Sequence, residues 1–284
     1  MKPPTEAPSP APLPSQRPSL FALRVVPPPL VGRAVGVGAI VLCLALWWGL
    51  TWGATPETRL VSPVLLPSPM EVIRSFPSLW TERALLESIA ATLRRVLSGF
   101  AFAIAVGVPL GILAGAYRVF DAAFFPIALF GRNIPIAALI PLTILWFGIE
   151  ETQKTMFIFL ATVPFVFSDA VDAVNTVQER YVETAQTLGA SARQVVSKVL
   201  IALALPGIYN SLRNLFGLAF GYIMLAELIN AKYGLGYLLS TSQRRGLSEH
   251  IILILIIIGT LAYGIDRLLY WFQLHLFPYL TRTE

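Results

Sequence analysis

The chain alternates between long apolar runs and shorter polar segments. An apolar run of about 20 residues, when helical, matches the hydrocarbon thickness of a lipid bilayer. Six such runs predict six membrane-spanning helices. They cover residues 34–53, 96–116, 120–147, 155–170, 208–229 and 251–272. An even number of spans places both ends of the chain on the same side, and we expect an all-α polytopic membrane protein.

Composition supports this class. Of the 284 residues, 56% are hydrophobic and 13% are charged, and the mean hydropathy is +0.69. A soluble domain carries about 25% charged residues. The net charge of +5 comes from basic residues scattered through the loops, so it does not indicate a nucleic-acid partner. The single cysteine, Cys43, lies in an expected span and leaves no internal disulfide.

The N-terminal segment differs from the rest of the chain. Ten of the first 29 residues are proline, a composition that forms neither a helix nor a core. The apolar stretch that follows starts too late for a secretory signal peptide. We expect a disordered or extended tail over residues 1–30 and one transmembrane domain over residues 31–284.

The third expected span contains Pro126, Pro135 and Pro141. Proline removes a backbone donor and clashes with the preceding turn, so it bends or breaks a helix. Two interpretations stay open for Pro135 and Pro141. The freed carbonyls line a pathway or allow bending, or the kink is static.

The longest polar interruption in the second half of the chain covers residues 176–206. Thr176 and Glu179 have the spacing of a capping box, which predicts that a helix begins at Thr176. Gly189 predicts its end, because glycine accepts the left-handed conformation that closes helices. The apolar face of this helix comprises Val177, Tyr181, Ala185 and Leu188.

A second helix is predicted directly after this glycine. Ser191 and Gln194 form another capping-box pair. The helix is expected to run to Leu205–Pro206, where the proline turns the chain. The product is a short helix, a glycine hinge and a second helix between two spans, a shape suited to docking into a groove of a partner.

Three parts of this loop resemble the cytoplasmic coupling loop of binding-protein-dependent ABC importer permeases. They are Glu183-Thr184-Ala185, Gly189-Ala190-Ser191 and Leu205-Pro206-Gly207-Ile208. The usual loop reads Glu-Ala-Ala, three residues, Gly, nine residues, an apolar residue, any residue and Leu-Pro. This chain departs from it at Thr184, where Ala is usual, and at Ile201-Ala202, where Leu-Pro is usual. The missing first proline predicts a straighter entry into the next span.

Other segments resemble the nitrate, sulfonate and taurine branch of the same family, and together they extend the resemblance over roughly residues 60 to 280. They are Leu66-Pro67-Ser68-Pro69, Ile134-Pro135, Leu145-Trp146-Phe147-Gly148, Ala226-Glu227 and Gly234-Leu235-Gly236-Tyr237.

The resemblance implies the MetI-like permease fold of type I ABC importers. It implies that the loop couples the chain to an ATPase through Glu183, Thr184, Ala185, Leu188, Gly189, Ala190 and Ser191. It further implies a cytoplasmic ABC ATPase dimer that holds ATP and Mg²⁺, a second permease copy, and a periplasmic or lipid-anchored solute-binding protein. The chain would lie in the inner membrane with both termini in the cytoplasm, and its solute would be a small anion.

Charge counting does not orient the chain by itself. Arg118, Arg180, Arg193, Lys198 and Arg282 fall on the side of the 176–206 loop. The opposite side carries Arg59, Arg74, Arg83, Lys154, Lys232, Arg244 and Arg245. This distribution runs against the positive-inside rule, so the orientation depends on the resemblance.

Few polar residues lie within the expected spans. Glu227 and Asn230 lie near the outer end of the fifth span, and an ionisable group facing lipid costs several kcal/mol. Two interpretations of Glu227 stay open. It belongs to an outer gate or its hydrogen-bond network, or it is a structural carboxylate bonded to neighbouring backbone. Asn133 and Pro135 are further candidates for the pathway.

The sequence lacks recognisable motifs for nucleotide binding, catalysis or metal binding. It contains no Gly-x-x-x-x-Gly-Lys-Ser/Thr phosphate loop and no Gly-x-Ser-x-Gly elbow, and His250 and His275 are isolated. We expect no enzymatic activity and no cofactor or metal bound by this chain. The competing class is an ATP-independent secondary transporter or channel, which predicts buried charge relays or inverted repeats.

Overall fold

The computed structural model describes residues 28–53, 58–229 and 231–279. Most of these residues are helical. The helices are α1 (Pro29–Leu50), α2 (Pro69–Arg74), α3 (Phe76–Thr81), α4 (Leu85–Ala116), α5 (Arg118–Asn133), η2 (Ile136–Ala138), α6 (Leu139–Phe147), α7 (Glu151–Asn175), α8 (Glu179–Thr187), α9 (Ala192–Gln194), η3 (Val195–Leu200), α10 (Ile201–Glu227), α11 (Leu235–Arg244) and α12 (Ser248–Leu276). The proline-rich segment 1–27 of the expected tail lies outside the described residues.

Five of the described helical runs are long and apolar enough to cross a membrane. They comprise α1, α4, α7, the run Ala192–Glu227 that ends with α10, and α12. Most of them extend beyond the apolar segments that predicted them. The 32 residues of α4 span about 48 Å at 1.5 Å per residue, against about 30 Å for the hydrocarbon layer, so the helix projects beyond the bilayer.

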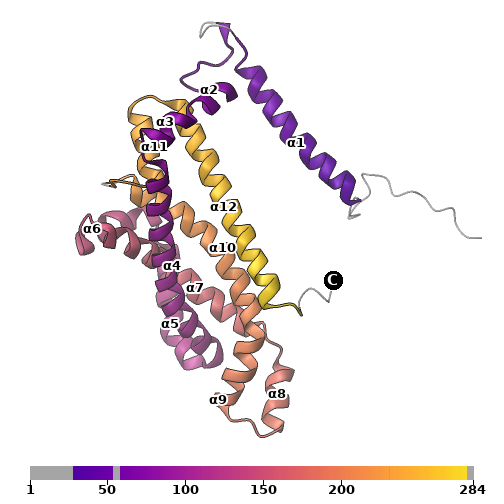
Figure 1. The fold of residues 1–284 in the computed structure, drawn as a ribbon. Helices are drawn as coiled ribbons and strands as arrows, with labels where there is room; N and C mark the ends of the chain where they lie inside the picture. Colours follow the sequence, from indigo (N-terminus) through magenta and orange to yellow (C-terminus); the bar gives the residue numbers. More distant parts are fainter. Residues whose placement is uncertain (1–27, 54–57, 230, 280–284) are drawn as a thin grey trace, which may run out of the picture.

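The third expected span is divided in two. Helix α5 ends at Asn133, and the following helical segment, Ile136–Phe147, is bent away from it by 93°. The break falls at Ile134 and Pro135, where the backbone is extended and proline supplies no donor. In Figure 1, α6 projects sideways from the bundle that contains α4 and α7. The two helices count as a sixth span only if they cross together as one bent unit.

Helices α4 and α7 pack against each other at backbone distance. A Cβ atom added at Gly111 of α4 would lie 2.5 Å from Ala170 Cβ and 2.6 Å from the Phe167 carbonyl oxygen. Gly107 and Gly115, one turn to either side, meet α7 in the same way. Stripes of small residues four apart let membrane helices approach closely and gain van der Waals contact. The α4–α7 pair therefore forms the centre of the bundle.

The largest hydrophobic core extends from this pair to α10 and α12. Phe100 of α4 meets Phe216 of α10 edge to face, with ring centroids 5.5 Å apart. Ile158 of α7 and Ile254 of α12 are fully buried in the same cluster. Arg213 of α10 binds Asp266 of α12 at 2.5 Å and so joins these two helices through charge as well.

Helix α1 stands apart from this core. None of its residues is buried, and Figure 1 shows it diverging from the bundle. Its C-terminal end is held by a hydrogen bond in which the Trp47 indole donates to the Pro67 carbonyl, at 2.9 Å. Cys43 is exposed on this helix.

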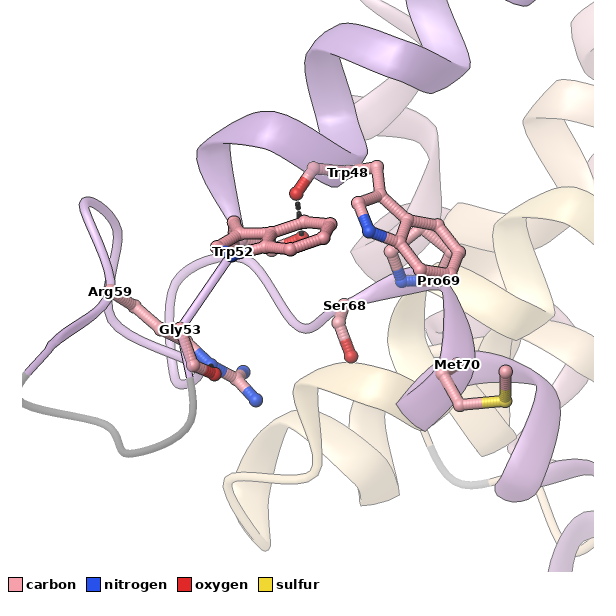
Figure 2. Close-up of a pocket in the computed structure, with 8 residues that line it drawn as sticks. Trp48, Trp52, Gly53, Arg59, Ser68, Pro69 and Met70 are labelled. Carbon is pink, nitrogen blue, oxygen red and sulfur yellow. Dashed lines mark hydrogen bonds between the residues drawn. The ribbon is translucent and has the colours of Figure 1, made fainter.

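A pocket of about 300 Å³ lies where α1 approaches α2. Figure 2 shows Trp48 and Trp52 on one side of it and Ser68 on the other. Arg59, which also lines the pocket, binds both carboxylate oxygens of Glu71 at 2.9 and 3.1 Å. The guanidinium lowers the pKa of Glu71 to about 2. Glu71 also accepts from the Ser68 backbone at 2.7 Å, so one charged group both caps α2 and holds the preceding loop.

Replacing Gly111 with alanine is expected to lower the thermal midpoint of the purified protein. Alanine has the better helix propensity by about 1 kcal/mol, but the added methyl overpacks the α4–α7 contact at a cost of about 1–3 kcal/mol. Gly259→Ala is the matched control, because nothing lies within 4 Å of its added Cβ. Its midpoint should be unchanged or higher. Size-exclusion chromatography of heated samples measures the thermal midpoints of both variants. Equal midpoints for Gly111→Ala and Gly259→Ala would contradict the close packing of α4 and α7.

Candidate functional site

The polar loop predicted to meet a partner forms one end of the molecule. Helices α8 and α9 lie together at this end in Figure 1, and α3 and α11 lie at the opposite end. We call the exposed surface formed by α8 and the turn over residues 188–191 the coupling surface.

The first helix of this surface begins later than predicted. The Thr176 hydroxyl donates to the Asp172 carbonyl at 2.8 Å and closes the end of α7, while α8 begins at Glu179 with Gln178 as its N-cap residue. The expected capping box of Thr176 and Glu179 is therefore wrong. Helix α7 continues to Asn175, so Thr176 serves the helix before it instead of the helix after it.

The predicted end at Gly189 is confirmed. Its φ is +82°, in the left-handed region that glycine accepts. The Ala190 N–H donates to the Ala185 carbonyl at 3.0 Å, and the Gly189 N–H donates to the Gln186 carbonyl at 2.9 Å. These two bonds form a Schellman motif, which satisfies the last carbonyls of α8 and fixes the direction of the turn.

The second capping pair is also present. Gln194 Oε1 accepts from the backbone N–H of Ser191 at 2.8 Å and from its hydroxyl at 3.0 Å. The predicted turn at Pro206 is wrong. The helical run that begins at Ala192 continues through Pro206 to Glu227, a total of 36 residues. A π-helical stretch over Val195–Leu200 precedes the proline, and tertiary packing buries Pro206 within α10.

The coupling surface is open to solvent. Glu183, Thr184, Gly189 and Ser191 are exposed, and Ala185 and Ala190 are partly buried. Leu188 is 83% exposed. Between α8 and α10 lies a cavity of about 280 Å³, lined by Val177, Tyr181, Leu203 and other residues. None of the residues of α8 is buried, and the Schellman motif at Gly189 satisfies carbonyls at its C-terminal end.

A buried ion-pair network occupies the opposite end of the bundle. The Arg95 guanidinium of α4 donates to Glu227 Oε1 of α10 at 2.7 Å. The same guanidinium donates to both Glu151 oxygens of α7, at 2.5 and 2.7 Å, and to the Tyr233 carbonyl at 2.7 Å. The side chain of Arg95 is 3% exposed and that of Glu227 is 0% exposed. One arginine thus joins three helices and the link to α11.

The remaining bonds to Glu227 come from α4 and α11. The Thr92 hydroxyl donates to this carboxylate at 2.8 Å and accepts from the Leu235 N–H at 3.0 Å. The Gly236 N–H donates to Glu227 Oε2 at 2.9 Å. A Cβ atom at Gly234 would lie 2.5 Å from the Glu227 carboxylate. The Gly-Leu-Gly sequence therefore lets the start of α11 close over a buried charge.

The structure does not bring the predicted pathway residues together. Glu227 lies in the network, at the other end of the bundle from the coupling surface. Asn133 is exposed at the end of α5, where its side-chain amide donates to the Leu129 carbonyl at 2.7 Å, and Pro135 marks the break before α6. Asn230 lies outside the described residues. No hydrogen bond within the described part of the chain joins Asn133 to Glu227.

Arg95 is the residue that sequence reasoning missed. The signal was present, because a carboxylate at Glu227 within an apolar helix needs a cation in another helix when it is charged. The sequence did not show which cation would lie opposite it.

This architecture is that of a polytopic helical membrane protein. The family described as binding-protein-dependent transport system inner membrane component matches residues 107–281. The taurine transport system permease protein of Escherichia coli (strain K12) is 30% identical over 250 residues, which cover 86% of this chain and 89% of that protein. The putative aliphatic sulfonates transport permease protein of Bacillus subtilis (strain 168) is 28% identical and covers 77% and 80% of the two chains.

The fold has a solved counterpart as well. A chain of the inward-facing MetNI methionine ABC transporter matches with a TM-score of 0.54 at 22% identity, over 68% of this chain and 97% of that chain. The protein therefore belongs to the binding-protein-dependent ABC permease family and has the MetI-like fold. It is a multi-pass inner-membrane transport subunit that works with an ATPase partner. This membership decides against the alternative of an ATP-independent secondary transporter or channel.

Replacing Arg95 with alanine is expected to destabilise the protein strongly, because it leaves Glu227 buried without a counter-charge. Breaking a buried pair from one side costs about 3–5 kcal/mol. The matched control is Arg94→Ala, since the Arg94 side chain is 71% exposed and its contribution is about 0–1 kcal/mol. The double variant Arg95→Met, Glu227→Met should recover part of the loss. The thermal midpoint of each variant in detergent measures these changes in stability. Equal midpoints for Arg95→Ala and Arg94→Ala would contradict the proposal that the buried network stabilises the fold.

Proposed function

We propose that this chain imports a small anionic solute by alternating access, as one half of a permease dimer that docks one ATPase subunit on each coupling surface. The observation that carries the proposal is the coupling surface itself. A short helix whose C-terminal carbonyls are satisfied by a Schellman motif, with an exposed apolar side chain at Leu188, projects from the end of a membrane bundle. Such a helix is suited to fit a groove on another protein.

Rigid connection to the bundle supports a mechanical role. The Schellman motif at Gly189 and the capping pair at Ser191 hold the turn between α8 and α9. From Ala192 the chain is helical to Glu227, a run of 36 residues that spans about 54 Å. A displacement of α8 would therefore reach the outer network through one continuous helical run.

ATP can shift the permease between its inward-facing and outward-facing states only if it binds the transporter more tightly in one state than in the other. Closure of the nucleotide-binding dimer would draw the two coupling surfaces together and favour the outward-facing state. ATP and Mg²⁺ would be held by the partner ATPase, and this chain would bind no cofactor and perform no hydrolysis itself. The coupling contacts would be made by Glu183, Thr184, Ala185, Leu188, Gly189, Ala190 and Ser191.

The same proposal orients the chain. If α8 meets a cytoplasmic ATPase, both termini are cytoplasmic, and α3 and α11 face the outside, where a periplasmic or lipid-anchored binding protein would deliver the solute. The second permease would be another copy of this chain. The relatives named for taurine and for aliphatic sulfonates favour a small anion as the solute.

The outer network is our candidate for part of the gate. Glu227 connects α4, α10 and the start of α11, and Arg95 adds α7. Opening of the outer side would require some of these bonds to exchange. Asn230, Asn133 and Pro135 remain candidates for the pathway.

Glu183→Ala and Gly189→Val are expected to uncouple ATP hydrolysis from uptake. The first removes an exposed charge of the coupling surface, and the second forces a β-branched residue into a left-handed backbone conformation. If Glu183 is central to the contact, its loss weakens coupling by about 2 kcal/mol or more, which is about thirtyfold. Proteoliposomes that contain the assembled transporter report solute uptake and ATPase stimulation in parallel.

Arg118→Ala is the control for these variants, because Arg118 is exposed at the same end of the molecule but lies outside α8. It should retain uptake. Normal uptake together with normal stimulation in both α8 variants would remove the coupling role.

A further inference from the structure

An apolar groove runs between α4, α10 and α12, which belong to helical runs long enough to cross a membrane. Its volume is about 440 Å³. Leucine, isoleucine, phenylalanine and alanine side chains form most of its wall, and Arg213 is the one charged residue among the described residues that line it. Leu97 and Leu268 on the wall are more than half exposed, so the groove opens at the surface of the bundle. We call it the apolar groove.

The groove is long and narrow. On α4 it extends from Leu93 to Ile104, a separation of about 16 Å along the helix. Its volume spread over that length leaves a cross-section of about 27 Å². An α-helix with its side chains is at least about 10 Å wide, which is about three times that cross-section. A single hydrocarbon chain is narrow enough to fit, because carbon atoms in contact lie only about 4 Å apart.

The groove also matches the depth of one lipid leaflet, which is about 15 Å, half of the hydrocarbon layer. Arg213 lies 14 residues before Glu227, where α10 ends, and Arg267 lies 19 residues after Ser248, where α12 begins. These separations correspond to about 21 Å and 28 Å along the helices. Across a layer of about 30 Å that begins at these helix ends, both arginines lie within about 10 Å of its boundary on the α8 side.

Arg213 carries binding capacity that its protein partners leave over. Its guanidinium donates to both Asp266 oxygens, at 2.5 and 3.2 Å, and to Gln273 Oε1 at 3.3 Å. A guanidinium has five N–H donors, so two of them are not engaged by these three bonds. Gln273 lies nearer than Asp266 to the end of α12 on the α8 side, so the charge is directed toward the membrane boundary.

A second arginine adds positive charge at the same level. Arg267 is exposed, and its guanidinium lies 5.8 Å from the ring centre of Tyr263 and 5.9 Å from that of Tyr270. Arg213 lies 4.9 Å from the same Tyr270 ring. No salt bridge to Arg267 occurs within the described part of the chain. Two arginines beside one aspartate leave an excess positive charge in a membrane span, where a charge without a partner is costly.

We propose that the apolar groove holds one acyl chain of an anionic glycerophospholipid whose phosphate pairs with Arg213 and Arg267. The phosphate oxygens would accept from the donors that Asp266 and Gln273 leave over, in charge-assisted hydrogen bonds. Basic pockets between membrane helices near one face of the bilayer are suited to anionic headgroups. The chain would extend from the boundary on the α8 side along α4 toward Leu93. The inference needs neither an ATPase nor a particular orientation of the protein.

The first test compares two lipids with identical acyl chains. The full-length protein is purified in a non-ionic detergent, stripped of lipid and incubated with phosphatidylglycerol or phosphatidylcholine, and native mass spectrometry counts the bound molecules. We expect phosphatidylglycerol to bind about tenfold more tightly, because the compensating cation of phosphatidylcholine weakens the pairing with the arginines. Equal affinities for the two lipids would overturn the proposal.

The second test removes the headgroup contacts. Arg267→Gln should reduce the preference for phosphatidylglycerol about threefold or more, and it leaves no carboxylate without its salt bridge. The double variant Arg213→Gln, Asp266→Asn should reduce it as well, since it removes the ion pair from both sides. Arg118→Gln is the matched control, because Arg118 is exposed at the α8 end of the bundle and does not line the groove. An unchanged preference in Arg267→Gln, or an equal loss in the control, would overturn the phosphate assignment.

The third test fills the groove without touching the arginines. Ala101 is exposed and lines the groove, so Ala101→Phe should weaken the binding of both lipids about tenfold while the preference between them stays. Ala105→Phe is the matched control, since Ala105 is exposed on the same helix and does not line the groove. It should bind both lipids as the parent protein does, and an equal loss in the two variants would overturn the placement of the acyl chain.

The same mass spectra separate other occupants. Loss of the permease dimer in Ala101→Phe, with the dimer retained in Ala105→Phe, would overturn the proposal in favour of a second copy of this chain in the groove. Displacement of phosphatidylglycerol by millimolar inorganic phosphate or taurine would overturn it in favour of a site for a free anion.

Discussion

The buried pair of Arg95 and Glu227 is the interaction on which the end of the bundle opposite α8 depends. Removing two charges from water costs several kcal/mol for each ion, and the cost is recovered only when the partners meet with good geometry and their remaining groups are bonded. Here the bonds to Glu151, Thr92 and the start of α11 complete that requirement. The positions of four helices are therefore linked, because a shift of any one leaves a buried charge with fewer bonds.

The two ends of the bundle are built differently. Glycines let α4 and α7 pack at backbone distance, and the network joins the ends of these helices far from α8 to α10 and α11. At the other end α8 is closed by a Schellman motif at its C-terminus and lies beside a cavity, with Leu188 exposed. The bundle thus carries one solvent-exposed helix, α8, at one end. This arrangement is consistent with a subunit of the ABC permease family, whose energy source is a separate ATPase. The continuous run from Ala192 to Glu227 connects the two ends.

Differences between sequence and structure fall where two local signals compete. Thr176 has the spacing of an N-cap, but α7 extends far enough to use its hydroxyl as a C-terminal partner. Pro206 has the character of a helix breaker, but membrane helices tolerate proline when neighbouring helices pack around it. Pro135 does break the third span, because the extended backbone there leaves α5 and α6 at 93° to each other.

The sequence by itself determined the class of the protein, its apolar helices and the turn at Gly189. These features follow from local properties, namely run length, hydrophobicity and the backbone conformations that glycine accepts. Only the tertiary structure decided that Arg95 is the partner of Glu227, that Gly234 must lack a side chain, and that Pro206 stays within a helix. Each of these depends on which atoms lie across an interface in a medium of low dielectric, and no local pattern along the chain carries that information.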